Sequence, residues 1–441
     1  MMSLLIRNGT ILTMSDAFEV VEGDVSIRDG RIAGVGRCDD APHDHVINAA
    51  GALVMPGLIQ THLHLCQTLF RGLADDLVLM DWLRTRVWPL EAAHTPASLR
   101  ASARLAACEL LAGGTTAVLT METVHDTDVV CEEIAASGLR ATIGKCLMDA
   151  DPDVPARLRE PTRLAIDEAL ALKARWHGAS DGRLRIAFAP RFAVACSREL
   201  LEAVGSLSAR DGTLVHTHAS ESRGEIDIVR ARTGMDNLPY LAATGLASPR
   251  LCAAHCVWVD DEAQALIAGH DVKVMHCPGS NLKLGSGLAP IVELRRRGVT
   301  VSLGADGAAC NNRLDMFGEM RLAAVLQSVR LGPGLLPARD VVWMATRGGA
   351  RTLGLDDDIG SIEVGKRADV IVVGRRGPHQ APAHDPYATL VYATSASDVR
   401  TTVVDGCVLM DHGQLIGLDL EATLDEAGRE ARQLAQRAGV A

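Results

Sequence analysis

The sequence predicts an α/β protein, a (β/α)8 TIM-type barrel with a small β-sandwich domain built from both ends of the chain. Through the middle of the chain, short apolar runs alternate with longer segments of helical periodicity. Both ends instead show the alternating apolar and polar residues of half-buried strands. With 441 residues, 48% of them hydrophobic, the chain can bury a large core, which excludes a mainly disordered protein.

The small β domain is expected over residues 1–55 and 360–415. Turns such as Asn8-Gly9 and Asp29-Gly30 separate the N-terminal runs in the manner of hairpins of short antiparallel strands. The same alternation of apolar and polar residues appears in GSIEVGKRADVIVVG, near the C-terminal end of the chain. The last segment, 416–441, contains LDEAGREARQLAQRAG and predicts a closing helix.

The barrel is expected over residues 56–359. Its strands follow one another at roughly 35 residues per strand–helix step, which is the pitch of a closed barrel. A doubly wound open sheet is the alternative, but no glycine-rich phosphate loop follows an early strand. The eight apolar runs that predict the strands are 58–64, 115–121, 140–146, 184–190, 213–218, 251–255, 272–276 and 300–306.

Composition narrows the choice of partners. The 44 basic and 55 acidic residues give a net charge of −11, which argues against nucleic acid or an anionic membrane as the main partner. No apolar run reaches the ~18 residues of a membrane span, and the chain does not start like a secretion signal. The 11 cysteines are scattered singly, as in a reducing compartment. We therefore expect a cytoplasmic protein that acts on a small molecule.

Metal-binding residue types gather where barrel enzymes place their active sites, at the C-terminal ends of the strands. His62 and His64 alternate on the first strand, so both imidazoles can face one point. His218 on the fifth strand and Asp306 on the eighth could complete the shell of a single divalent ion. Three histidines and one carboxylate suit Zn²⁺, with Fe²⁺ as the alternative. The competing interpretation is that these are ordinary buried histidines.

The motifs PGLIQTHLH, HTHASES, AAHC and GADGAACNN resemble those of the amidohydrolase superfamily, specifically its mononuclear deaminase and chlorohydrolase branch. The resemblance runs almost from end to end of the chain. It implies four metal ligands, His62, His64, His218 and Asp306. It also implies that Glu221 shuttles protons, that His255 orients the attacking water, and that Asp306 accepts a proton. The fourth strand ends Ala189-Pro190-Arg191 and offers no bridging lysine, which favours one metal ion.

The resemblance implies a hydrolytic deaminase that releases ammonia from an amino-substituted purine-like ring, and two sets of residues point to different rings. Gln67 and Arg191 look like those of guanine deaminase, so an oxo-aminopurine is the first expectation. Trp82 and Glu91, with GSNLKLGSG, are similar to S-adenosylhomocysteine and methylthioadenosine deaminases, where the carboxylate would hold ribose hydroxyls and the indole would pack on the ligand. An s-triazine or a pterin is the third choice.

A hypothesis from another class is a non-catalytic assembly protein, because some amidohydrolase-like chains have lost their ligands. Here every ligand that the family requires is present, which argues against it. Family analogy further implies a homo-oligomer, a dimer or larger. The sequence assigns no role to five further residues near the predicted site: His216, His276, Cys66, Cys310 and Lys145.

Overall fold

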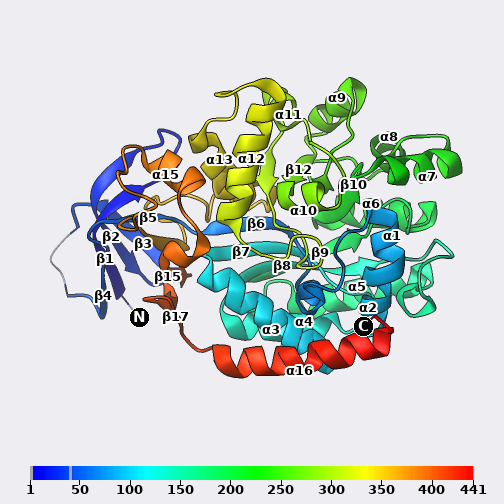
Figure 1. Cartoon of the computed structure of the whole chain (residues 1–441), viewed down its shortest axis with the longest axis horizontal. Helices are drawn as coiled ribbons and strands as arrows, with labels where there is room; N and C mark the ends of the chain where they lie inside the picture. Colours follow the sequence, from blue (N-terminus) through cyan, green and yellow to red (C-terminus); the bar gives the residue numbers. More distant parts are fainter. Residues whose placement is uncertain (1–2, 39–41, 441) are drawn as a thin grey trace.

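The computed structural model describes residues 3–38 and 42–440, and it contains a barrel beside a broad sheet (Figure 1). Residues 1–2 and 39–41 of the predicted β domain, and residue 441 of the predicted closing helix, lie outside the described residues. The division of the chain at residues 55, 360 and 415 stays a proposal. None of the described helices combines the length and apolarity that crossing a bilayer requires.

Eight parallel strands form the barrel, hydrogen-bonded in chain order, and they coincide with the eight predicted runs. The first and last strands meet across the closure, where the Asp306 amide donates to the His62 carbonyl at 3.0 Å and the Thr61 hydroxyl donates to the Leu303 carbonyl at 3.0 Å. The predicted barrel is confirmed. Its strands are β6 (Leu58–Leu63), β7 (Thr115–Met121), β8 (Arg140–Leu147), β9 (Leu184–Pro190), β10 (Val215–Ala219), β11 (Leu251–His255), β12 (Lys273–His276) and β13 (Val301–Leu303).

Helices surround the barrel and start and stop at the expected signals. Ser197 caps α6 by accepting the Leu200 amide, and Gly212, at φ +75°, ends it in the left-handed conformation that suits glycine. The helices of the ring are α3 (Pro96–Ala112), α4 (Thr127–Ser137), α5 (Thr162–Trp176), α6 (Arg198–Asp211), α7 (Arg223–Thr233), α8 (Asn237–Ala243), α9 (Asp261–Gly269), α11 (Ile291–Arg296), α12 (Met316–Leu331), α13 (Ala338–Ala345) and α14 (Arg347–Thr352).

Short helical segments cover the C-terminal face of the barrel or connect it to the sheet. Those near the site come mainly from the long excursion after β6. The segments are η1 (Leu65–Phe70), α1 (Leu79–Trp82), η2 (Leu83–Val87), α2 (Trp88–Ala92), η3 (Ala156–Leu158), α10 (Pro278–Lys283), α15 (Pro386–Tyr392) and η4 (Ala396–Asp398).

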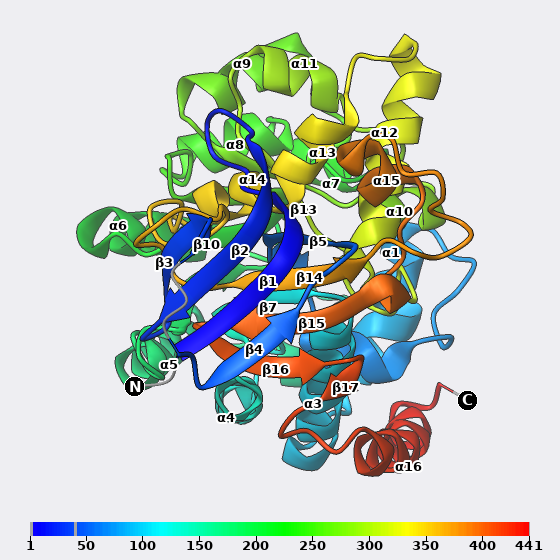
Figure 2. The same ribbon diagram turned by 90° about the vertical axis from the view of Figure 1, so that its left-hand side faces the viewer.

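Both chain ends join in one nine-stranded sheet (Figure 2). The join is β5, which pairs antiparallel with β14 and parallel with β1. The predicted small β domain is therefore present as one connected mixed sheet, with β1 also parallel to β4. The strands are β1 (Ser3–Leu12), β2 (Val20–Arg28), β3 (Arg31–Gly36), β4 (His45–Asn48), β5 (Ala52–Pro56), β14 (Val370–Gly374), β15 (Val399–Val404), β16 (Cys407–Asp411) and β17 (Gln414–Leu415).

Two polar contacts attach the outer elements to the barrel. At the start of β8, the buried Arg140 binds Asp369 through two nitrogens, at 2.8 and 3.0 Å, and Asp405 at 2.9 Å. The C-terminal helix α16 (Leu420–Ala438) lies along α3 (Figure 1), where Arg104 donates to Glu426 at 2.7 Å.

Candidate metal-dependent active site

Four residues from three separate strand ends converge at the C-terminal face of the barrel. Ligand atoms of His62, His64, His218 and Asp306 all lie within 4.8 Å of one another. Asp306 Oδ1 is 3.2 Å from Nε2 of both His62 and His64, and the Nε2 atoms of His64 and His218 are 3.2 Å apart. The structure therefore brings together the four predicted ligands, which are distant in sequence.

Hydrogen bonds at the other ring nitrogen aim each histidine inward. His64 Nδ1 donates to the Met121 carbonyl at 2.8 Å, and His218 Nδ1 donates to the Arg191 carbonyl at 2.7 Å. Each proton is therefore held at Nδ1, which leaves the Nε2 lone pair free to bind a metal. His62 shares a 2.7 Å hydrogen bond through Nδ1 with His216, so His216 orients a ligand. The sequence missed this role.

The donor set fits a divalent metal ion. His62 Nε2 is buried without a hydrogen-bond partner among the described residues, which is costly unless another group binds it. Burial lowers the pKa of His62 to about 4 and that of His218 well below its ordinary value, so both rings are neutral at pH 7, as metal ligands must be. Three imidazoles and one carboxylate are the ligands of a catalytic metal with an open position.

Glu221 and His255, the other two predicted catalytic residues, lie beside this cluster. His255 Nε2 is 3.5 Å from Glu221 Oε2 and 3.8 Å from Asp306 Oδ2. Burial raises the pKa of Glu221 above its ordinary value. Burial opposes the charged form of His255, but Glu221 and Asp306 outweigh it and raise the pKa of the imidazole. A carboxyl group and an imidazole whose pKa values are both raised therefore lie beside the cluster.

Three residues that the sequence did not single out hold these groups in place. Asn281 Oδ1 accepts from His255 Nδ1 at 2.8 Å, and the Ser286 hydroxyl donates to Glu221 Oε1 at 3.2 Å. The Ser280 hydroxyl donates to Asp306 Oδ2 at 2.7 Å. All three belong to the motif GSNLKLGSG, from which the sequence predicted only the type of substrate. Its proximity to His255 and Asp306 depends on the barrel closing.

The strand ends carry backbone strain at the reacting groups. His255 has φ +71° and Asp306 has φ +65°, in the left-handed region that such residues rarely adopt. Ser220, next to Glu221, has φ +53°. Strain of this kind costs about 1–3 kcal/mol per residue and persists where surrounding contacts fix a functional geometry.

A cavity opens from the metal cluster under the short helices after β6. Trp82 and Arg191, two of the predicted substrate residues, are on its wall, and the Trp82 indole N–H has no hydrogen-bond partner among the described residues. The cavity therefore offers polar donors beside the apolar side chains of its wall. Its lining is His64, Leu79, Trp82, Leu83, Arg191, Phe192, His218, Glu221, Leu284 and Asp306.

The other two predicted substrate residues, Gln67 and Glu91, do not line this cavity. They lie behind Arg191, one of its wall residues. Glu91 accepts two hydrogen bonds from Arg191, at 2.5 and 3.1 Å, and one from Gln67 at 2.9 Å. Arg191 and Glu91 are both almost fully buried. The side-chain oxygen of Gln67 packs closely against Gly307. A Cβ atom added at Gly307 would lie only 2.1 Å from Gln67 Oε1. Direct contact of Gln67 and Glu91 with substrate stays a prediction.

Cys66, Cys310 and His276 are three of the residues to which the sequence assigns no role. The amide of Cys66 donates to the buried Glu122 at 2.9 Å, and the thiol of Cys310 donates to the Gly307 carbonyl at 3.2 Å, so both stabilise loops of the site. Neither ring nitrogen of the buried His276 has a hydrogen-bond partner among the described residues.

Lys145 lies apart from the metal cluster, beside a second group of potential metal ligands formed by His125, Glu160 and Glu168. Its ammonium pairs with Glu160 and lies 3.4 Å from Glu168. Because the ammonium contacts both carboxylates, Lys145, Glu160 and Glu168 form an ion-pair network.

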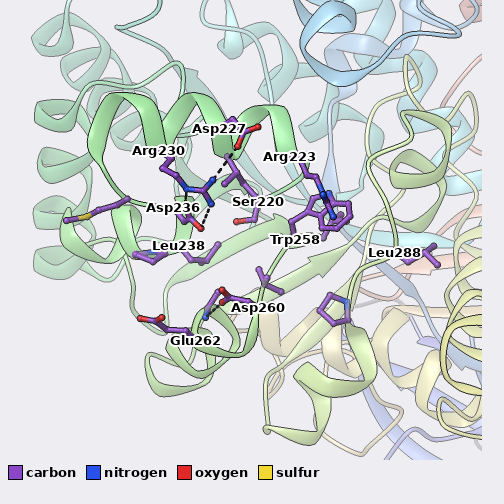
Figure 3. Close-up of a pocket in the computed structure, with 17 residues that line it drawn as sticks. Ser220, Arg223, Asp227, Arg230, Asp236, Leu238, Trp258, Asp260, Glu262 and Leu288 are labelled. Atoms are coloured by element: carbon purple, nitrogen blue, oxygen red, sulfur yellow. Dashed lines mark hydrogen bonds and ion pairs between the residues drawn. The ribbon is translucent and has the colours of Figure 1, made fainter.

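A larger hollow adjoins the loops of Glu221 and His255 without including any metal-cluster residue (Figure 3). Arg223 stacks on Trp258, with its guanidinium 4.1 Å from the ring centre. Arg230 pairs with Asp236 at 2.7 Å on the opposite side. The hollow therefore lies next to those two loops, and Arg230, one of its charged side chains, pairs with the carboxylates of Asp227 and Asp236.

Comparison with known proteins places the whole chain among metal-dependent hydrolases. Residues 53–409 match the sequence model of the Amidohydrolase family. The 5'-deoxyadenosine deaminase of Methanosarcina acetivorans is 39% identical over 442 residues, covering 99% of this chain and 100% of that protein. The 5-methylthioadenosine/S-adenosylhomocysteine deaminase of Pelotomaculum thermopropionicum is 37% identical over 443 residues, covering 99% and 100%.

Solved structures agree with this placement. The adenosine deaminase of Xanthomonas campestris, solved with bound zinc, superimposes with a TM-score of 0.93 at 33% identity, covering 99% of both chains. The guanine deaminase of E. coli superimposes with a TM-score of 0.84 at 25% identity, covering 93% of this chain and 100% of that chain. The similarity is thus greater to the adenosine-type enzyme than to the guanine-type enzyme.

Proposed function

The chain belongs to the amidohydrolase family, and from this premise we propose that it deaminates adenosine-type nucleosides modified at the 5' position. It is a hydrolase acting on carbon–nitrogen bonds of cyclic amidines. The oxo-aminopurine expected first from the sequence becomes the weaker candidate, because the curated relatives are named for adenosine derivatives.

We propose zinc as the metal, held by His62, His64, His218 and Asp306. The zinc-bound structural relative supports this choice. When bound, such an ion lowers the pKa of a water molecule toward neutrality and so supplies a nucleophile at pH 7.

Glu221 transfers protons between the water and the substrate. Its carboxylate takes one proton from the attacking water and delivers it to the ring nitrogen beside the carbon that carries the amino group. It then relays the second proton of the water, accepted first by Asp306, to the amino group, which leaves as ammonia. Burial supports this role because it raises the pKa of Glu221 toward the working pH. Ser286 holds the other oxygen of the carboxylate in place at 3.2 Å.

His255 and Asp306 orient the attacking water. The Nε2 atom of His255 is buried without a hydrogen-bond partner among the described residues, while Asn281 fixes the opposite side of the ring. Because Nδ1 already donates its proton to Asn281 and the neighbouring carboxylates raise the pKa of the ring, the second proton of the imidazolium is on Nε2 and points toward the water. Asp306 Oδ2, 3.8 Å away, accepts the second proton of the water as it adds to the ring.

The observation that carries the nucleoside proposal is the Arg191–Glu91 pair. Glu91 occupies both terminal nitrogens of the guanidinium, which leaves fewer N–H groups for the paired contact with an oxo-purine edge on which the guanine interpretation rests. Arg191 can still direct a remaining N–H at the cavity, where with the Trp82 N–H it would contact the sugar. The apolar wall of Leu83 and Phe192 suits the purine ring.

Ammonia release by zinc-loaded protein tests this proposal. The panel holds adenosine, 5'-deoxyadenosine, methylthioadenosine, S-adenosylhomocysteine, guanine, a pterin and melamine. We expect kcat/KM for the best nucleoside to exceed that for guanine by at least about 100-fold, as expected when a buried polar group is mismatched. Faster turnover of guanine would overturn the nucleoside proposal and leave the deaminase assignment intact. A homo-oligomer in the cytoplasm stays part of this proposal.

A further inference from the structure

At the opposite end of the barrel from the metal cluster lies a cavity of about 300 Å³ with an excess of positive charge. Three arginines from separate elements line it: Arg185 at the start of β9, Arg250 just before β11, and Arg351 in α14. The only carboxylate in the lining belongs to Asp211, and Lys173 neutralises it at 2.6 Å.

Strand alternation directs one of these arginines inward. Ala187, two residues after Arg185 on β9, lies in the apolar interior of the barrel with Leu353 and Ile359. Because residues two apart on a strand share a face, Arg185 faces the N-terminal mouth of the barrel. Arg250 precedes β11 and lines the cavity on the side of α6, where its Nε contacts Ser208.

Arg185 lacks the partners that a partly buried guanidinium needs. Among residues 3–38 and 42–440, no carboxylate lies within 4.0 Å of its guanidinium, and the guanidinium donates no hydrogen bond to them. Burial lowers the pKa of Arg185; the attraction of Asp358 opposes this shift, and repulsion from Arg140 and Arg367 adds to it. Arg250 makes one hydrogen bond, to the Ser208 hydroxyl at 3.1 Å, and no ion pair in the same ranges. Arg351 has a loose pair with Asp356 at 3.6 Å, with both side chains exposed.

Neutral donors complete the wall. The Ile186 amide donates to His177 Nδ1 at 3.1 Å, so the neutral ring carries its proton on Nε2 and can donate. The buried hydroxyl of Thr142 also lines the cavity. Converging guanidinium groups with neutral donors match the oxygens of a phosphate.

We propose that this cavity binds a small oxyanion of the phosphate class, free or as a phosphate monoester, between Arg185 and Arg250. The anion would balance the excess positive charge at the barrel floor. The site is separate from the active site, so it neither requires nor replaces the proposed deaminase chemistry.

Calorimetric titration of the zinc-loaded protein with inorganic phosphate, and separately with ribose 5-phosphate, tests the proposal at constant ionic strength. We expect saturable binding that weakens at least ten-fold in Arg185→Gln and in Arg250→Gln. The matched control is Arg163→Gln, which removes the same charge from a 94% exposed side chain and should bind like the wild type. Tighter binding of ribose 5-phosphate than of inorganic phosphate would support the site and identify a monoester as its ligand.

Two results would overturn the proposal. One is equal affinity in Arg185→Gln and the wild type, which would assign the binding to the active-site metal. The other is the absence of binding of either anion at millimolar concentration. A second measurement does not depend on the ligand: without phosphate, Arg185→Gln should melt no lower than Arg163→Gln because it relieves repulsion, whereas a structural ion-pair role for Arg185 requires a clear fall in Tm.

Discussion

Arg191 and Glu91, one hundred residues apart in sequence, form a buried pair with two hydrogen bonds, at 2.5 and 3.1 Å, beside the metal cluster. Arg191 follows β9 and Glu91 lies in α2, so the pair ties the covering helices to the end of a barrel strand. The sequence assigned these two residues to competing substrates, and the structure joins them in one unit.

Breaking this pair should destabilise the protein. In Arg191→Gln, a buried carboxylate loses its cation, which costs about 3–5 kcal/mol of unfolding free energy. The double variant Arg191→Gln/Glu91→Gln should lose clearly less than the sum of the two single variants, because neither charge is then left alone. Urea unfolding measures all four proteins. Additive losses would mean that the two side chains do not act as a pair.

Glu221→Gln should retain the metal and lose turnover. A glutamine keeps the shape but cannot carry a proton, so we expect kcat to fall by about 10²–10⁴-fold. Asp227→Asn, a charge-matched change on the exposed part of α7, should be active. Ammonia assays and elemental analysis check both variants. Wild-type turnover in Glu221→Gln would remove this residue from the mechanism.

Removal of the metal should abolish activity and lower Tm, because His62 Nε2 and the other buried ligand atoms lose the ion that would bind them. Zinc should restore both. The variant His64→Ala should fail to regain zinc, whereas His412→Ala, a change at an 88% exposed side chain, should regain it fully. Bound metal below about a tenth of an equivalent after careful purification would favour the non-catalytic assembly protein.

Arg140→Gln should weaken the attachment of the sheet to the barrel. Asp369 and Asp405 would both lose their buried cation, and we expect a loss of about 3–5 kcal/mol of unfolding free energy. Arg163→Gln, at the surface, should change stability by less than about 0.5 kcal/mol. Equal stabilities of the two variants in denaturant unfolding would contradict the role given to Arg140.

Glu225 should make stability depend on pH. Burial, and then the charge of Glu221, raise its pKa from 4.5 to about 7, so the folded state keeps a proton that the unfolded state has lost between these values. Stability contributed by this group therefore falls as pH rises from 4.5 to 7, by up to about 1.4 kcal/mol per unit. Glu225→Gln cannot titrate and should remove this slope. An unchanged slope in unfolding measurements across this range would show that other groups cause it.

Much of the site could be predicted because it depends on local signals. The HxH spacing on one strand, and single histidines or an aspartate after later apolar runs, place ligands at strand ends once a barrel is assumed. The supporting residues could not be found in this way. Ser280, Asn281 and Ser286 touch Asp306, His255 and Glu221 only because β10 to β13 lie side by side in the closed barrel.

The barrel, the sheet from both chain ends and the metal cluster could be predicted from residue patterns alone, because periodicity and strand-end position follow from local geometry. Three contacts became visible only in the folded protein: Glu91 binds Arg191, His216 orients His62, and Arg185 and Arg250 line one cavity at the barrel floor. Side-chain partners across the fold depend on which strand ends and loops meet in space, and no spacing along the chain encodes the distance between them.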